Sequence, residues 1–150
     1  MESNTERSER IRGIRNKEDL LDEWDKLGRL GDIEGAIISY VKAYDYVSFV
    51  ELDKKLMPFI YTEGDFALFL PDCNEMIVLW AGLSEKLSEI YARLLREKRI
   101  FVEPTSFLTY FIDGGNLKFP LCKQLKRKYK KIHWLPITLR VVPPMRRTEL

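Results

Sequence analysis

Two short apolar runs interrupt the helical pattern in the middle of the chain. They cover residues 66–70 and 76–81 and are joined by Pro71-Asp72-Cys73-Asn74-Glu75, a segment of turn formers. Short β-prone runs on either side of such a segment predict a β-hairpin. Since patterns typical of amphipathic helices stand before and after this hairpin, we expect a fold of the α+β class.

Four segments have apolar residues at helical spacing, and each follows a residue that can cap a helix. Asn16 and Asp32 precede the first two segments. Ser48 begins the third with a capping box, in which it accepts from the backbone of Glu51 while the Glu51 carboxylate reaches back. Ser84 opens the fourth and most regular segment. The predicted helices are residues 17–30, 33–44, 49–57 and 84–99.

The pattern returns to β-structure after the fourth helix. Residues 100–102 and 107–112 are predicted strands. Asp113-Gly114-Gly115-Asn116 is a strong turn that leads the chain back into residues 117–120. A second antiparallel hairpin is therefore expected near the C-terminal end.

Length and composition indicate one globular domain with short ends. A chain of 150 residues with 45% apolar content can bury one sizeable core. We expect a flexible arm over residues 1–16, a single domain over residues 17–142 and a flexible tail over residues 143–150. The apolar runs are far shorter than a membrane span, and the N-terminus lacks the apolar stretch of a secretory signal. A cytoplasmic protein that does not bind membrane is expected, with Cys73 and Cys122 as free thiols.

Positive charge is concentrated at the C-terminal end of the chain. Residues 118–150 contain ten Lys or Arg and one acid, whereas the other 117 residues contain fifteen basic and twenty-two acidic side chains. A segment so rich in cations attracts polyanions, because each phosphate that it neutralises releases condensed counterions. This division of charge predicts a polyanionic partner.

The order of the predicted elements resembles a winged helix-turn-helix domain. The similarity begins with residues 37–41 and 46–52, continues with residues 87–99 in the place of the recognition helix, and ends with residues 107–118 in the place of the wing. It covers a little over half of the chain and is one of pattern. It implies a winged-helix-like three-helix core with an antiparallel wing, an inserted β-hairpin between the second and third core helices, and an extra N-terminal helix.

One segment departs from this pattern. In a helix-turn-helix the second and third helices are joined by a turn of about three or four residues, whereas residues 58–83 intervene here. The predicted hairpin could pack against the wing as extra sheet, or it could occupy the surface that DNA would approach.

The resemblance directs attention to the outer face of the predicted recognition helix. Arg93 and Arg96 could reach guanine edges or phosphates from this face. Glu85, Glu89 and Glu97 are interleaved with them. The alternative is a solvated helix face held by salt bridges.

The basic stretch from residue 123 to residue 134 interleaves cations with the rings of Tyr129 and Trp134. In a nucleic-acid groove, such cations follow phosphates while rings stack on bases or sugars. Alternatively, both rings are core anchors and the lysines only solubilise a loop. Together with Lys118 on the flank of the wing, the candidate nucleic-acid-binding residues are Arg93, Arg96, Lys118, Lys126, Arg127, Lys128, Tyr129, Lys130 and Lys131.

The sequence contains no motif that indicates catalysis or metal binding. His133 is the sole histidine and has no carboxylate nearby in the sequence to orient it. Pro71-Asp72 matches only the opening of a nuclease signature, which also needs a following acid, one further residue and a lysine. Gly114-Gly115 is not followed by the Lys-Ser or Lys-Thr pair of a phosphate-binding loop. We expect a non-catalytic protein with neither metal nor cofactor.

These observations favour a nucleic-acid-binding protein, in the first place one that binds double-stranded DNA as a regulator or accessory factor. The N-terminal helix has Leu20, Trp24 and Leu27 on a narrow stripe, which packs on the body of the domain or forms a homodimer interface. The alternative is a winged-helix protein-interaction module whose basic segment contacts an acidic partner. The position of the acids distinguishes the two hypotheses, because carboxylates around the recognition helix would repel DNA.

Overall fold

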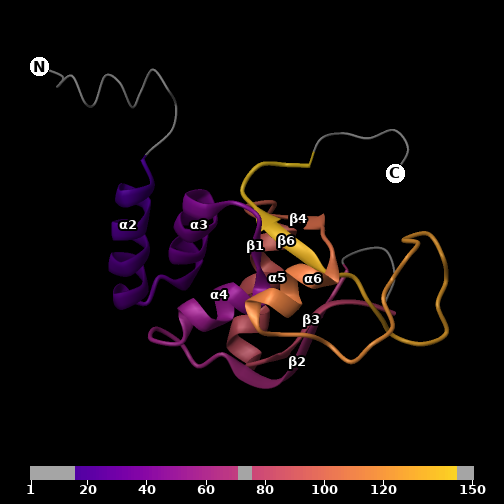
Figure 1. Ribbon diagram of the computed structural model, residues 1–150. Helices are drawn as coiled ribbons and strands as arrows, with labels where there is room; N and C mark the ends of the chain where they lie inside the picture. Colours follow the sequence, from indigo (N-terminus) through magenta and orange to yellow (C-terminus); the bar gives the residue numbers. More distant parts are fainter. Residues whose placement is uncertain (1–15, 71–75, 145–150) are drawn as a thin grey trace, which may run out of the picture.

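The computed structural model describes residues 16–70 and 76–144, which form a mixed α+β fold with five helices and two small sheets (Figure 1). Helices α2 and α3 lie side by side on one flank in Figure 1, and the sheets with the remaining helices make up the other part. In chain order the elements are α2 (Lys17–Leu30), α3 (Ile33–Tyr44), β1 (Val47–Ser48), α4 (Phe49–Leu56), β2 (Glu63–Phe69), β3 (Ile77–Leu83), α5 (Glu85–Arg96), β4 (Phe101–Pro104), α6 (Phe107–Asp113), β5 (His133–Trp134) and β6 (Ile137–Arg140).

The four helices predicted from caps and apolar spacing are all present, and each begins at its predicted capping residue. Asn16 Oδ1 accepts from the backbone of Asp19 at 2.8 Å, and Asp32 Oδ1 accepts from Gly35 at 3.0 Å. Ser84 Oγ accepts from the backbone N–H of Leu87 at 3.2 Å in the same way. These side chains satisfy N–H groups that the first turn of a helix leaves without an intrahelical partner.

The predicted capping box of α4 is half confirmed. Ser48 Oγ accepts from the backbone N–H of Glu51 at 3.1 Å, as expected. The Glu51 carboxylate, however, accepts a hydrogen bond from the Tyr40 hydroxyl at 2.7 Å. Ser48 also donates to Asp113 Oδ2 at 2.7 Å, so this cap connects α4 to the end of α6.

The first predicted hairpin is confirmed. Strands β2 and β3 pair in antiparallel orientation, and β5 joins β3 on its other side in parallel orientation. The predicted turn over residues 71–75, which includes Cys73, lies outside the described residues. Cys122 is a free thiol.

The second sheet brings together parts of the chain that are far apart in sequence. β6 is its central strand and pairs in antiparallel orientation with β1 on one side and β4 on the other. Leu139 of β6 lies opposite Val47 of β1 and Val102 of β4. β4 agrees with the predicted strand near residues 100–102.

The predicted antiparallel wing over residues 107–118 is wrong, because its first strand is helix α6. Ser106 Oγ accepts from the backbone of Leu108 at 3.2 Å and caps this helix. Gly114 ends it with φ +91°, a left-handed conformation that glycine adopts without steric cost. Residues 117–120 do not form the second wing strand either. The glycine pair is thus a helix terminus and not a hairpin turn.

Helix α2 packs on α3, and its apolar stripe is used within the chain. Leu20 and Trp24 are buried, and Leu27 packs against the core. The Trp24 ring lies 4.9 Å from that of Tyr40 and 5.2 Å from that of Phe59, measured between centroids. The prediction of a homodimer interface through Leu20, Trp24 and Leu27 is therefore wrong, and the alternative of packing on the body is confirmed.

The predicted flexible arm covers residues 1–16 and the predicted flexible tail covers residues 143–150. Of these, residues 1–15 and 145–150 lie outside the described residues. Within residues 16–70 and 76–144, no helix has the length and apolar character needed to cross a membrane.

Candidate nucleic-acid interface

The basic loop, residues 123–131, is a surface segment whose flanking residues on the two sides are hydrogen-bonded to each other. The backbone N–H of Cys122 donates to the Trp134 carbonyl at 2.8 Å, and the Trp134 N–H donates to the Pro120 carbonyl at 2.8 Å. Trp134 belongs to β5, which pairs with β3, and its indole N–H donates to the Leu79 carbonyl at 3.3 Å. The loop therefore projects from a fixed base in the core.

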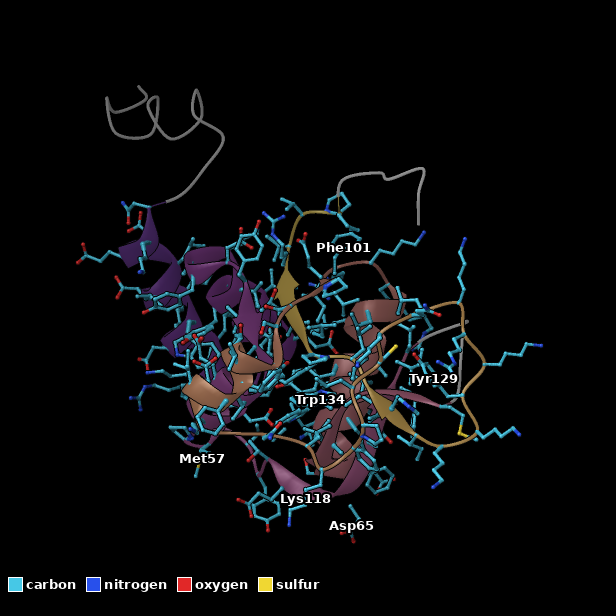
Figure 2. The ribbon with its side chains drawn as sticks, turned by 45° about the vertical axis from the view of Figure 1, so that its right-hand side comes forward. Met57, Asp65, Phe101, Lys118, Tyr129 and Trp134 are labelled. Atoms are coloured by element: carbon cyan, nitrogen blue, oxygen red, sulfur yellow. The ribbon has the colours of Figure 1, made fainter. Side chains whose placement is uncertain are left out.

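Tyr129 orders the interior of the basic loop. Its hydroxyl accepts from the backbone N–H groups of Lys123 at 3.2 Å and of Gln124 at 3.1 Å. Its ring stacks on His133, with 3.8 Å between ring centroids and 25° between planes. His133 Nδ1 donates to the Lys131 carbonyl at 2.8 Å, since a carbonyl oxygen can only accept. Figure 2 shows Tyr129 at the base of the loop, with nitrogen-tipped side chains pointing away from the protein.

The two aromatic rings of the basic stretch have structural contacts. Trp134 is only 1% exposed and lies in the core, so it cannot stack on a base in the folded protein. Tyr129 uses its hydroxyl and one ring face within the chain, and the Arg127 guanidinium lies 5.6 Å from its ring centroid. The interpretation as a core anchor is confirmed for Trp134, and Tyr129 fixes the shape of the loop.

The lysines of the basic loop are not neutralised by the rest of the described chain. Six of its nine residues are cationic. In the described part of the chain, no carboxylate lies within 4 Å of the ammonium groups of the five lysines. Their charges therefore add to one positive surface potential. The exposed lysines are Lys123, Lys126, Lys128, Lys130 and Lys131.

Another cation of the C-terminal region has a structural role. Arg140 on β6 forms two 2.9 Å hydrogen bonds with the Asp45 carboxylate, and it contacts Glu103 at 3.3 Å. The Arg140 guanidinium lowers the pKa of Asp45 below its usual value. This arginine connects β6 to the end of α3 and is not part of the free positive surface.

The candidate residues on α5 are in a different electrostatic setting. Arg93 forms an ion pair with Glu34 on α3, and Arg99 contacts the same carboxylate at 3.3 Å. Glu34 thus neutralises part of this face, and the alternative of a salt-bridged helix face is confirmed for Arg93. Arg96 is exposed near the end of α5.

The structure does not gather all the candidate residues into one surface. Lys118 lies at the lower edge of Figure 2, well apart from Tyr129 at the right. Arg93 is bound to α3, whereas the basic loop is anchored to β5. Only the set from Lys126 to Lys131 is contiguous.

An apolar groove that the sequence did not indicate lies beside the basic loop. It has a volume of about 400 Å³ and runs between the beginning of α6 and the first residues of the loop. The sequence predicts a strand at Phe107, so it does not indicate a groove at the beginning of a helix here. Ser106 before an apolar run and Gly114 after it were the available signals for a helix here. The walls include Phe107, Leu121, Cys122, Lys123, Leu125 and Leu135.

Asp53 is a carboxylate enclosed between α4, β3 and α5. It accepts from the Tyr91 hydroxyl at 2.7 Å and from the Trp80 indole N–H at 2.8 Å. Burial raises the pKa of the Asp53 carboxyl to about 6, although these hydrogen bonds act in the opposite direction. Both oxygens are occupied by fixed donors, which indicates a structural role.

Among residues 16–70 and 76–144, no group of three or more His, Cys, Asp or Glu side chains could hold a metal ion. Comparison of the chain with protein-family models, with curated proteins and with solved structures gave no match. Charge, burial and groove geometry are therefore the grounds on which a function is assigned.

Proposed function

We propose that this protein binds nucleic acid through the basic loop and acts as a non-catalytic regulator or accessory factor. The observation that supports this most directly is the set of five exposed lysines that no described carboxylate pairs with. Lysines left in water beside one another repel, and phosphates relieve this repulsion with release of counterions. Nucleic acid is the partner with the matching linear array of charge.

The arrangement of elements supports a winged-helix-like scaffold for this loop. When the β2–β3 hairpin, α6 and β5 are set aside, α3, β1, α4, α5, β4 and β6 follow the order helix, strand, helix, helix, strand, strand, and these three strands form one antiparallel sheet. The wing then corresponds to the connection between β4 and β6. This connection, residues 105–136, includes α6 and the basic loop, so we place the contact with nucleic acid there.

Phosphate contacts, and not base reading by α5, account for affinity in this proposal. Arg93 and Arg99 share the single carboxylate of Glu34, which offsets part of their charge. Glu85, Glu89 and Glu97 are exposed on or beside the same helix, where they would repel a phosphate backbone. We therefore expect binding with little sequence preference and with steep salt dependence.

One observation favours the second candidate function, a protein-interaction module that contacts an acidic partner. Helix α6 exposes large apolar side chains, with Phe111 68% and Ile112 79% accessible. Exposed apolar surface of this kind marks interaction sites. An acidic protein partner would use these side chains together with the basic loop.

The test compares two variants in which the same number of positive charges is removed. In one, Lys126, Lys128, Lys130 and Lys131 are replaced by glutamine. In the control, the exposed lysines Lys26, Lys42, Lys55 and Lys86 are replaced in the same way. Affinity for labelled DNA and RNA is measured by fluorescence anisotropy over a series of salt concentrations.

The proposal predicts that the loop variant binds more weakly and that its slope of log K against log salt falls by about one for each phosphate that the variant no longer neutralises. The control variant is expected to resemble the wild type. Equally weakened binding in both variants, or no binding of the wild type at low salt, would contradict the proposal.

A further inference from the structure

The groove beside the basic loop combines an apolar wall with a cation. Phe107 of α6 is 41% exposed and Leu125 of the loop is 39% exposed, and both line the groove. Lys123 belongs to the same lining, as do the hydroxyl-bearing residues Thr105 and Ser106. Such a groove suits an occupant with a flat apolar part and a negative charge next to it.

The groove is large enough for a small organic group. Its volume of about 400 Å³ is within the range of small-molecule sites, about 300–1,000 Å³, which are mostly apolar with a few polar groups. A nucleobase has an apolar face, polar edges and a phosphate one sugar away. Stacking of a base on an aromatic side chain is favourable for every base type.

We propose that this groove takes one unpaired base of a single-stranded nucleic acid, stacked on Phe107, while the neighbouring phosphates follow the basic loop. This inference rests on the proposed function and adds the class of nucleic acid. A duplex presents its phosphates to the loop equally well. Its bases are paired and stacked, and extrusion of one of them costs free energy, so the groove favours single strands.

The distribution of cations favours this occupant over an acidic peptide. Lys123 lines the groove, and cations continue along the chain at Lys126, Lys128, Lys130 and Lys131, well beyond the apolar wall. A nucleic acid strand has a negative charge on every unit and so matches a series of cations that extends away from the groove. An acidic peptide is one of the outcomes that the test distinguishes.

The test uses two phenylalanines on the same helix. Phe107→Ala removes the groove wall, whereas Phe111→Ala removes an equal side chain that is 68% exposed and does not line the groove. Affinities of the full chain are measured by fluorescence anisotropy for a labelled oligothymidylate and for a mixed-sequence duplex of the same length. Circular dichroism and the thermal midpoint verify the fold, and Leu125→Ala provides a second change in the groove.

Tighter binding of the oligothymidylate than of the duplex is expected for the wild type. Phe107→Ala should weaken oligothymidylate binding about five- to hundredfold and leave duplex binding unchanged, because the base in the groove no longer stacks on a ring. Leu125→Ala should act in the same direction, and Phe111→Ala should have no effect.

Three results would overturn the inference, and they differ from one another. If the lysine variant binds more weakly but Phe107→Ala and Phe111→Ala are indistinguishable, the basic loop binds nucleic acid and the groove does not take a base. If the wild type binds neither polymer, the proposed function fails and this inference fails with it. If a peptide of alternating glutamate and phenylalanine binds in a Phe107-dependent manner while neither polymer does, the groove belongs to an acidic protein partner.

Discussion

The hydroxyl of Tyr110 on α6 donates a hydrogen bond to the backbone carbonyl of Ile137 on β6 at 2.6 Å. The same hydroxyl accepts from the backbone N–H of Phe49 at 3.1 Å. Tyr110 is fully buried and is the inward-facing residue that fixes this short helix on the central strand. One phenol group thus connects α6, β6 and the beginning of α4.

We predict that Tyr110→Phe destabilises the protein by roughly 2–6 kcal/mol, because two buried backbone groups lose the phenol as partner and each costs about 1–3 kcal/mol. Chemical denaturation measures this change. Tyr44→Phe is the control, since the Tyr44 ring is 42% exposed, and it should change stability by less than about 0.5 kcal/mol. Equal stabilities of the two variants would show that the Tyr110 hydrogen bonds contribute little.

Asp53 should make stability depend on pH. Its folded-state pKa of about 6 lies above the ordinary value of 3.8, so the folded protein binds the proton more tightly than the unfolded chain does. Stability from this group is therefore present at low pH and is lost as pH rises from about 4 to about 6. Since one pKa unit corresponds to about 1.4 kcal/mol, the decrease amounts to about 3 kcal/mol.

Asp53→Asn isolates this effect. An asparagine amide can still accept from the Trp80 indole and donate to the Tyr91 hydroxyl, but it does not ionise. The free energy of unfolding of this variant minus that of the wild type should rise between pH 4 and pH 7 by about 2–3 kcal/mol. A difference that is constant over this range would contradict the raised pKa.

Tyr129→Phe should loosen the basic loop without unfolding the protein. The backbone N–H groups of Lys123 and Gln124 no longer have the phenol as acceptor, and both are on the surface, where water replaces it. We expect faster hydrogen exchange at these two amides, with a change in global stability below about 1 kcal/mol. Unchanged exchange at both amides would mean that Tyr129 does not order the loop.

Gly28 is placed where α2 approaches Phe59. A Cβ atom at this position would lie 2.4 Å from the Phe59 ring, so Gly28→Ala should displace that ring and cost about 1–3 kcal/mol. Leu30→Ala in the last turn of the same helix serves as the control, because Leu30 is 72% exposed. Thermal unfolding of both variants measures the difference, and equal midpoints would contradict the close packing of α2.

The parts of the fold that depend on local signals could be predicted from the sequence. Asn16, Asp32 and Ser84 satisfy N–H groups within one turn, so their role is visible in a few neighbouring residues. Helix α6 was mistaken for a strand because a run of six mostly apolar residues, 107–112, has no clear period. β6 was not predicted because its place depends on pairing with two strands distant in sequence.

The candidate site, too, could be predicted from the sequence only in part. The density of lysines in the basic loop is a property of the sequence, but the absence of pairing carboxylates in the described chain depends on the fold. The sequence leaves Arg93 available to a partner, but in the folded chain α3 brings Glu34 to it. The groove could not be predicted, because one of its walls is the beginning of helix α6, where the sequence predicts a strand. Long-range contacts therefore decide which of the cations remain free to bind a partner.

Contact between the basic loop and nucleic acid is measured most directly by an NMR titration of the isotope-labelled protein with an oligonucleotide. If the basic loop binds nucleic acid, backbone amide signals of residues 123–131 shift on addition, while those around Arg93 and Arg96 on α5 stay in place. Shifts concentrated on α5, with the basic loop unaffected, would contradict this contact.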